Sequence, residues 1–168
     1  TLSLRNVPTG TPAATSVRFS NTFVPTIPGE SVMLGTAVSP AATANRYLYT
    51  AGLASNESTE SSIYAIAPIA FTWKDLYVDF NTAPGAGKSR SVTGRIGSAS
   101  QTLTVSIADA NTTANDTTND VAVAAENLIN WITVPVGTPA LQVAIRTSAV
   151  MYIAPPAVST FSPKVIFI

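Results

Sequence analysis

Three groups of residues in this sequence could carry chemistry, and the first is the glycine-rich segment 85–89, GAGKS. It resembles the end of a phosphate-binding loop, in which backbone N–H groups at the start of a helix hold the phosphate. Such a loop needs another glycine five residues before the one that precedes the lysine, and Thr82 stands there. Residues 89–96 alternate as a strand does. The segment therefore predicts a hairpin connection rather than a nucleotide site.

The second group is the oxygen-rich segment 109–120, whose spacing resembles the calcium-binding loop of an EF-hand. The side chains at its ligand positions are Asp109, Asn111, Thr113, Asn115, Thr117 and Asp120. Ala114 replaces the glycine that the loop needs at its sixth position, and Asp120 replaces the bidentate glutamate. No helices are predicted on either side. A solvated loop without a metal is the favoured interpretation, and calcium binding is the alternative that a titration would decide.

The third group consists of acidic residues that lie close together in the sequence. Asp75 with Asp79, and Glu57 with Glu60, are the nearest candidates for the paired carboxylates of a glycoside hydrolase. Both pairs are more simply explained as solvated charges on strands or loops. The sequence has no cysteine and no histidine, which excludes disulfides, thiolate zinc sites and imidazole bases. We therefore predict a protein that is not an enzyme and that uses no cofactor.

Composition excludes further classes of partner. The chain has 168 residues, of which 11% are charged, against roughly 25% in a typical soluble protein. Nine basic and nine acidic side chains cancel, and no basic block is present, so we expect no nucleic-acid partner. The longest nearly apolar run, residues 63–73, is too short for a membrane-spanning helix. The first ten residues do not look like a retained secretory signal.

Short elements must position these residues. Five of the twelve prolines lie in residues 1–45, which predicts an extended N-terminal arm with brief strands, followed by one domain over residues 46–168. Alternation is clearest in three apolar sets, each on one face of a strand. Turn signals recur about every ten residues, as in an all-β sandwich or barrel. The three sets are Leu76, Val78 and Phe80; Leu103, Val105 and Ile107; and Leu141, Val143 and Ile145.

Large apolar side chains are the candidates for contacts between chains. The aromatic residues are scattered over different predicted strands, so packing in a core or an interface is favoured over stacking on sugars. The final strand is apolar on both faces and must be buried in a sheet or an interface. The interface candidates are Val17, Phe19, Phe23, Trp73, Trp131, Ile166 and Phe167.

The order of motifs between residues 46 and 155 resembles a known family. In chain order these motifs are YLY at 47–49, ESTE at 57–60, LYV at 76–78, APGAGKS at 83–89, LTVSI at 103–107, DTTN at 116–119, VAVAA at 121–125, and residues 134–139. They are similar to a jelly-roll family found among small bacteriophage and prophage virion proteins. The resemblance implies a homotrimeric, non-enzymatic protein displayed on a virion. The expected fold is all-β, a single jelly-roll β-sandwich with a Pro-rich N-terminal arm.

Two functions follow from this resemblance as expectations. The first is a capsid decoration, or cement, protein on the outer surface of the capsid, which stabilises the phage head by binding the major capsid protein between capsomers. The second is a receptor-binding head on a tail or fibre that recognises a glycan of the host surface. A shell-forming capsid protein and a secreted carbohydrate-binding module rank below these two.

Overall fold

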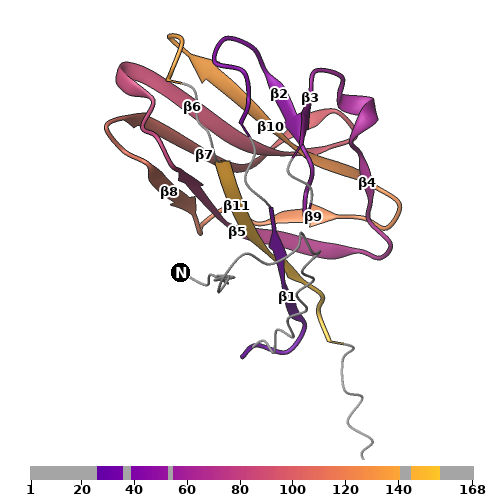
Figure 1. Ribbon diagram of the computed structural model, residues 1–168. Coiled ribbons are helices and arrows are strands. Elements are labelled where there is room, and N and C mark those ends of the chain that lie inside the picture. Colours follow the sequence, from indigo (N-terminus) through magenta and orange to yellow (C-terminus); the bar gives the residue numbers. More distant parts are fainter. Residues whose placement is uncertain (1–25, 36–38, 53–54, 141–144, 156–168) are drawn as a thin grey trace, which may run out of the picture.

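Two antiparallel β-sheets face each other in the structure, a computed structural model that describes residues 26–35, 39–52, 55–140 and 145–155 (Figure 1). The first sheet has the order β1 (Glu30–Leu34), β11 (Ile145–Tyr152), β5 (Phe71–Phe80) and β8 (Thr113–Asp116), with β9 (Val121–Val123) also paired to β5. The second has the order β3 (Asn56–Glu57), β2 (Arg46–Leu48), β10 (Leu128–Val136), β6 (Gly85–Ile96) and β7 (Ala99–Asp109), with β4 (Ala65–Ile66) also paired to β10. The predicted β-sandwich is thereby confirmed.

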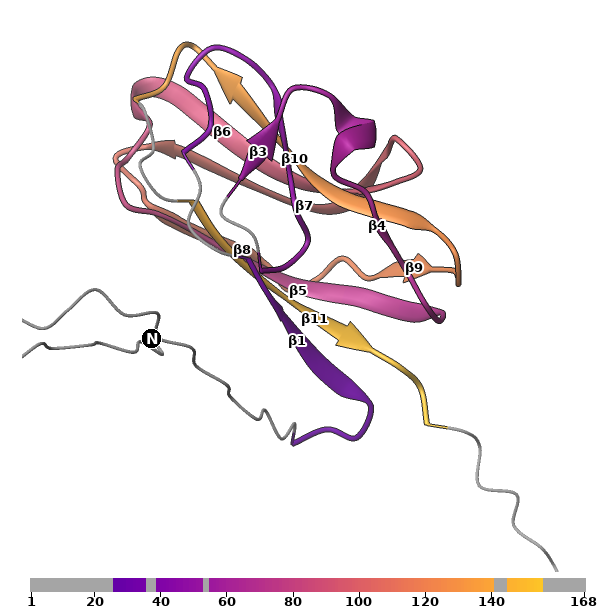
Figure 2. The same ribbon diagram turned by 45° about the vertical axis from the view of Figure 1, so that its right-hand side comes forward.

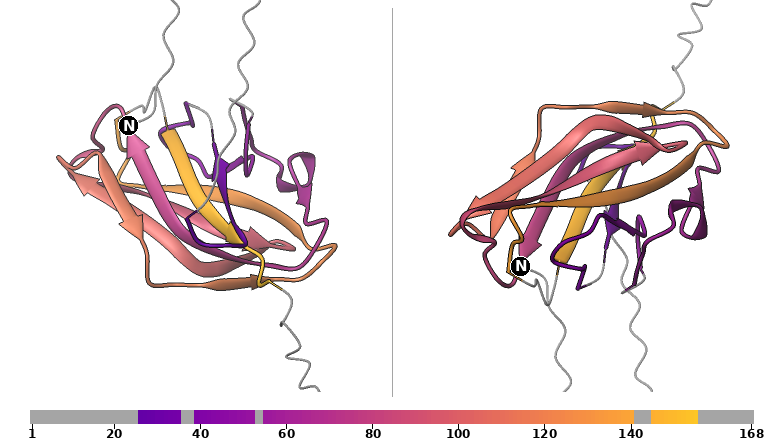
Figure 3. Two further views of the ribbon diagram at one scale, coloured as in Figure 1. Left: turned by 90° about the horizontal axis from the view of Figure 1, so that it is seen from below. Right: turned by 90° about the horizontal axis from the view of Figure 1, so that it is seen from above.

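One long strand organises each sheet. In the first sheet β5 pairs with β11 along one edge, while β8 and β9 lie one after the other along its opposite edge. In the second sheet β10 pairs with β6 along one edge and with β2 and β4 along the other. Figure 3 shows the two layers from below and from above. Every strand pair is antiparallel, so each sheet can bury one face and leave the other for solvent or a partner.

The core lies between the sheets, and sequence alternation predicted two of its strands correctly. Leu76, Val78 and Phe80 on β5 are buried, and so are the alternating residues of β7 from Leu103 to Ile107. Of the third predicted set, Ile145 is buried at the start of β11, whereas Leu141 and Val143 lie outside the described residues. Buried apolar area of this kind is the main source of stability in such a fold.

A bulge in β5 was not predicted. Asp75 has a φ of 52°, and the pairing with β11 shifts register next to it, between Ser148 and Val150. Phe71 and Trp73 face the core before the bulge, and the even-numbered residues from Leu76 onward face it afterwards. An inserted residue in one strand changes which alternate residues point inward, so both halves of β5 contribute to one core.

The β6–β7 hairpin turns at Gly97 and Ser98, where a turn was predicted. Ile96 pairs with Ala99, so the loop has two residues, and both have positive φ, 52° and 70°. Two-residue hairpins of this kind require positive φ at both positions, which glycine adopts without a steric penalty. The turn brings the outer ends of β6 and β7 together and positions the polar residues described below.

The structure corrects two predicted connections and places part of the N-terminal arm. Residues 113–116 form β8 instead of a continuous loop, and β6 begins at Gly85 within the expected turn. Both stretches pair with long neighbouring strands, and this overrides their turn-forming composition. Within the predicted arm, β1 pairs with β11 and is an integral strand of the first sheet. Residues 1–25 and 156–168 lie outside the described residues.

Candidate interaction surfaces

The outer face of the second sheet is covered by the chain itself over β10, whereas its β6–β7 part stays partly or fully exposed. Residues 55–66, here called the covering segment, include β3, the 3-10 helix η1 (Glu60–Ser62) and β4, and Figure 2 shows this stretch running alongside β10. Asn130 and Ile132 alternate with the core residue Trp131, so they point away from the core. They are nevertheless only 0% and 8% exposed. Ile63 of the covering segment is 1% exposed although it lies outside the main core cluster.

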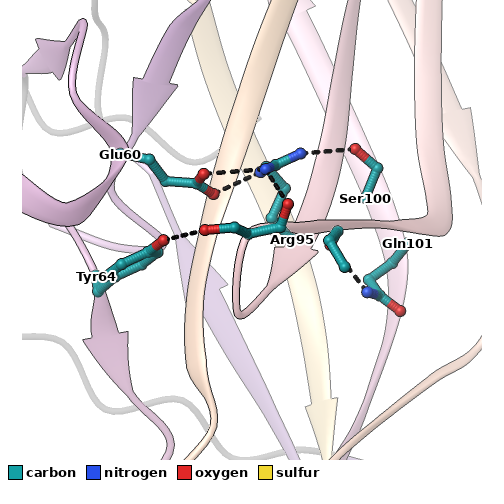
Figure 4. A network of polar contacts seen from close by, with 7 residues as sticks. Glu60, Tyr64, Arg95, Ser100 and Gln101 are labelled. Carbon is teal, nitrogen blue, oxygen red and sulfur yellow. Dashed lines mark hydrogen bonds and ion pairs between the residues drawn. The ribbon is translucent and has the colours of Figure 1, made fainter.

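A polar network fastens the covering segment to the β6–β7 hairpin (Figure 4). The guanidinium of Arg95 donates to both carboxylate oxygens of Glu60, with Nε–Oε1 and Nη2–Oε2 distances of 2.5 and 2.9 Å. It also donates to Ser100 Oγ at 2.8 Å and to the backbone oxygen of Ser98. Tyr64 Oη and Ser98 Oγ are 2.5 Å apart. The covering segment and the hairpin are therefore joined by a two-pronged ion pair and a hydroxyl contact.

The environment of Glu60 keeps its carboxylate ionised. The hydrogen bond from Arg95 lowers the pKa of Glu60 and raises that of Arg95. The two side chains are 11% and 12% exposed, so solvent screens this pair less than a surface pair. The Asn130 amide also favours the ionised carboxylate, although neither of its polar atoms makes a hydrogen bond of ordinary geometry. Tyr47 lies against the same guanidinium, 5.8 Å from ring centroid to Cζ.

In each of the two carboxylate pairs considered from the sequence, at least one carboxylate lies next to a cationic side chain. Glu60 is bound to Arg95, so in its pair with Glu57 it is held as an anion. Asp79 is bound to Arg146, and Asp75 lies 3.8 Å from the Lys74 ammonium. A glycosidase of the usual kind needs one carboxyl that stays protonated opposite one that is ionised. In the Glu57–Glu60 pair the hydrogen bond from Arg95 opposes a protonated Glu60, since it lowers the pKa of that carboxyl.

Asp116 joins the two sheets, and sequence reasoning did not single it out. Its carboxylate accepts from Thr104 N on β7 at 3.0 Å, and from Thr118 N and Asn119 N at 3.2 and 3.1 Å. The side chains of Thr118 and Asn119 donate as well. Burial raises the pKa of Asp116, but these hydrogen bonds outweigh that effect and bring it to about 2. Only its spacing from Thr118 and Asn119, which is typical of an Asx turn, could have indicated this role.

Two of the predicted calcium ligands lie on a paired strand, and a third is hydrogen-bonded to the backbone of another strand. Thr113 and Asn115 lie on β8, and Asp109 accepts a hydrogen bond from Gly87 N at 2.7 Å. Across the part of the chain that the structure describes, no group of three or more acidic, histidine or cysteine side chains could hold a metal ion. The same Asp109–Gly87 contact ties the glycine-rich segment into the start of a strand.

The two tryptophans proposed for an interface form the centre of the core. Trp73 and Trp131 are 0% and 1% exposed, with ring centroids 4.1 Å apart and planes tilted by 47°. Gly94 lies against both, because a Cβ atom there would come within 3.3 Å of Trp73 and 3.4 Å of Trp131. Neither indole reaches the surface of the chain. The other interface candidates, Val17, Phe19, Phe23, Ile166 and Phe167, lie outside the described residues.

Arg90 is a fully buried cation, and no carboxylate of the described residues pairs with it. Its side chain is fully buried on β6 and donates to the Ala41 backbone oxygen at 2.6 Å and to Thr133 Oγ1 at 3.3 Å. Burial lowers its pKa to about 10, so it stays charged at neutral pH. All nine acidic side chains of the chain lie in the described residues, and the ion pairs found there do not include Arg90. Its visible role is to hold the connection between β1 and β2.

The outer face of the first sheet, in contrast, carries exposed apolar side chains. Leu34 on β1 is 57% exposed and Tyr77 on β5 is 49% exposed. A second exposed group lies near the β4–β5 and β9–β10 turns. It consists of Ile66, Ile69 and Leu128, of which Ile66 and Leu128 are direct cross-strand neighbours. Among the described residues, Ile27 and Val136 are the remaining exposed large apolar side chains.

Comparison with known proteins adds no family to these observations. No family model matches the sequence, and no curated protein matches it. Within the described residues, no helix is long and apolar enough to cross a membrane.

Proposed function

We propose that this chain is a non-enzymatic structural protein of a virion, and specifically a capsid decoration protein that binds between capsomers on the outside of a phage head. The observation that carries the proposal is the order in which the strands pair. Jelly rolls are the architecture of many viral capsid and lectin domains. Fold alone does not determine function, so the surface and the sequence resemblance must add to it.

The strand pairing is nested, as in a jelly roll. The first strand, β1, pairs with the last, β11, and β2 pairs with β10. Further inward, β5 pairs with β8 and β9, and β6 pairs with β7 across the hairpin. A long antiparallel ribbon that is folded over on itself gives this order, with the two sheets formed by alternate pairs. The nesting supports the jelly-roll assignment that the sequence resemblance implies.

The surface of the second sheet also suits a protein that is packed against neighbours. On β6 and β7, Ser91 pairs with Ser106 and Thr93 pairs with Thr104. These four side chains alternate with the core-facing positions and form an uncharged, hydroxyl-bearing surface that is partly or fully exposed. Buried interfaces are depleted in lysine, glutamate and aspartate, and the whole chain is only 11% charged. A low-charge hydroxyl surface therefore fits repeated contacts within a shell.

A receptor-binding head is the second candidate, and one observation favours it. Tyr47 and Tyr64 are partly exposed beside the Glu60–Arg95 ion pair. Partly exposed aromatic rings next to charged hydrogen-bonding groups are the usual components of small polar-ligand sites. Under this alternative the polar network at the hairpin would contact a host glycan.

Copy number in purified particles tests the proposal. The chain would be quantified by mass spectrometry relative to the major shell protein of particles from the same source. A ratio near one, or a simple fraction such as about one third, is expected for a decoration protein in a shell of repeated closed symmetry. A ratio of a few per cent would favour the tail or fibre head. Complete absence from particles would contradict both.

A further inference from the structure

The open outer face of the first sheet has an apolar centre. The strand registers align Leu34, Ser148, Tyr77 and Asn115 in one row across the sheet, and the next row contains Val32, Val150 and Lys74. Direct cross-strand neighbours point to the same side of a sheet. Leu34, Tyr77, Val32 and Val150 therefore lie together on the outside, and the first two are about half exposed.

Charged pairs lie at both ends of this apolar centre. At one end the Lys74 ammonium is 2.7 Å from a Glu30 carboxylate oxygen and 5.4 Å from the Tyr152 ring centroid. At the other end Arg146 is bound to Asp79. Each end thus carries both signs of charge, and the Lys74 end has one more anion than cation because Asp75 lies 3.8 Å from the same ammonium. The charges of these ion pairs sum to −1, so two such faces meet little long-range repulsion, and each end can exchange ion pairs with either end of a second face.

The face is large enough for a weak contact between two copies. Its strands β1, β11, β5, β8 and β9 have 5, 8, 10, 4 and 3 residues, which at about 3.3 Å per residue and 4.8 Å between strands cover about 500 Å². Two copies in contact would bury about 1,000 Å² in total, the size of a weak or transient interface rather than of an obligate one. The group of Ile66, Ile69 and Leu128 would cover far less.

We propose that this face is the contact between two copies of the chain, which pack face to face about a twofold axis with Leu34 and Tyr77 at its centre. A face that is apolar in the middle and carries both charges at each end is complementary to itself, which is the requirement of a twofold interface. Tyrosine is also among the residues that most often dominate binding energy at such a centre. The inference concerns self-association and holds whether or not the chain belongs to a virion.

The test is the molar mass of the full chain in solution across a range of concentrations, by light scattering or sedimentation. The variants are Tyr77→Lys and Leu34→Lys, which put a charge in the centre of the face. The matched control is Ile66→Lys, because Ile66 is 66% exposed but lies on the second sheet. We expect a dimer for the parent chain and for the control. Both face variants should raise the dissociation constant by about 30-fold or more, the range of a central hot-spot residue.

Several results would overturn the proposal. These are a monomer at every concentration, an oligomer whose mass does not respond to either face variant, and a dimer that Ile66→Lys dissociates as readily. The sequence resemblance implies a homotrimer instead, and a trimer of the parent chain would overturn the twofold arrangement. Circular dichroism would establish that each variant is folded. If either lysine variant unfolds, Leu34→Gln, which keeps the size without the charge, decides between the same outcomes.

Discussion

The two outer faces of the sandwich are both formed by antiparallel strands, but one is partly covered by the chain and the other is exposed. On the second sheet the covering segment buries Asn130 and Ile132 and fixes itself through the Glu60–Arg95 pair. On the first sheet Leu34 and Tyr77 are left about half exposed. Beneath the covering segment Asn130 is buried without a hydrogen-bond partner for its side chain, a cost that burial of Ile132 and the Glu60–Arg95 pair must offset. The difference shows that one face is partly completed within the chain, whereas the other keeps its apolar centre accessible to a partner.

The largest difference between the two faces should be in the free energy of unfolding that is lost when one apolar side chain is truncated. Ile63→Ala removes a side chain that is 1% exposed under the covering segment, and we expect it to lower the free energy of unfolding by about 2–5 kcal/mol. Leu34→Ala on the open face should change it by about 0.5 kcal/mol or less in the dilute chain. Urea unfolding of both variants measures the difference. Equal losses would mean that the covering segment is not part of the folded unit.

Acid should act through Asp116, which holds the two sheets together. Its pKa falls from 3.8 to about 2 on folding, so its stabilising effect is complete above about pH 4 and is lost as the pH falls towards 2. The shift corresponds to about 2 kcal/mol. Asp116→Asn should therefore be about that much less stable at pH 7, and the difference should vanish near pH 2. A constant difference between pH 7 and pH 2 would contradict this origin.

Removal of one carboxylate charge should lower the free energy of unfolding by a smaller amount, and the loss should be greater on the covered face than on the open one. Glu60→Gln leaves Arg95 partly buried without its anion, which should cost about 1–3 kcal/mol. Asp79→Asn breaks an ion pair whose side chains are 42% and 55% exposed, and exposed pairs contribute only about 0–1 kcal/mol. Thermal or urea unfolding in low and high salt would measure both. A larger loss for Asp79→Asn would reverse the comparison between the faces.

Calcium should have the smallest effect of all. The candidate ligands of segment 109–120 are spread along β8 and its flanks, and Asp109 is bound to Gly87. We therefore expect millimolar calcium to leave the unfolding temperature unchanged relative to magnesium at the same ionic strength. A rise that is specific to calcium, and that Asp120→Asn removes, would show that the segment rearranges around an ion.

The sequence predicted strands well where one face alone is buried. The alternation around Leu103 and Leu76 follows directly from the two-residue period of a strand. This alternation could not predict the bulge at Asp75, because a positive φ at an aspartate does not change the pattern of apolar residues. The alternation did not predict β8 either, because residues Thr113 to Asp116 have the composition of a loop and depend on β5 for their pairing.

The surfaces were much less predictable than the core strands. Glu60 and Arg95 are 35 residues apart in the chain, and only the fold shows that they meet. Arg90 occupies an inward position next to Val92, where a charged residue would have been assigned to the surface. Trp73 and Trp131 were considered for both core and interface, and their rings pack in the core. Such outcomes depend on contacts between distant segments, which spacing along the chain does not encode.

Oxidative footprinting of the tyrosines tests the contrast between the two faces most directly. Hydroxyl-radical labelling would be followed residue by residue in the dilute chain and in the concentrated, self-associated chain. The account predicts that Tyr77 on the open face becomes protected on association, whereas Tyr64 of the covering segment keeps its reactivity. Equal labelling of Tyr77 in both states, or protection of Tyr64 instead, would contradict it.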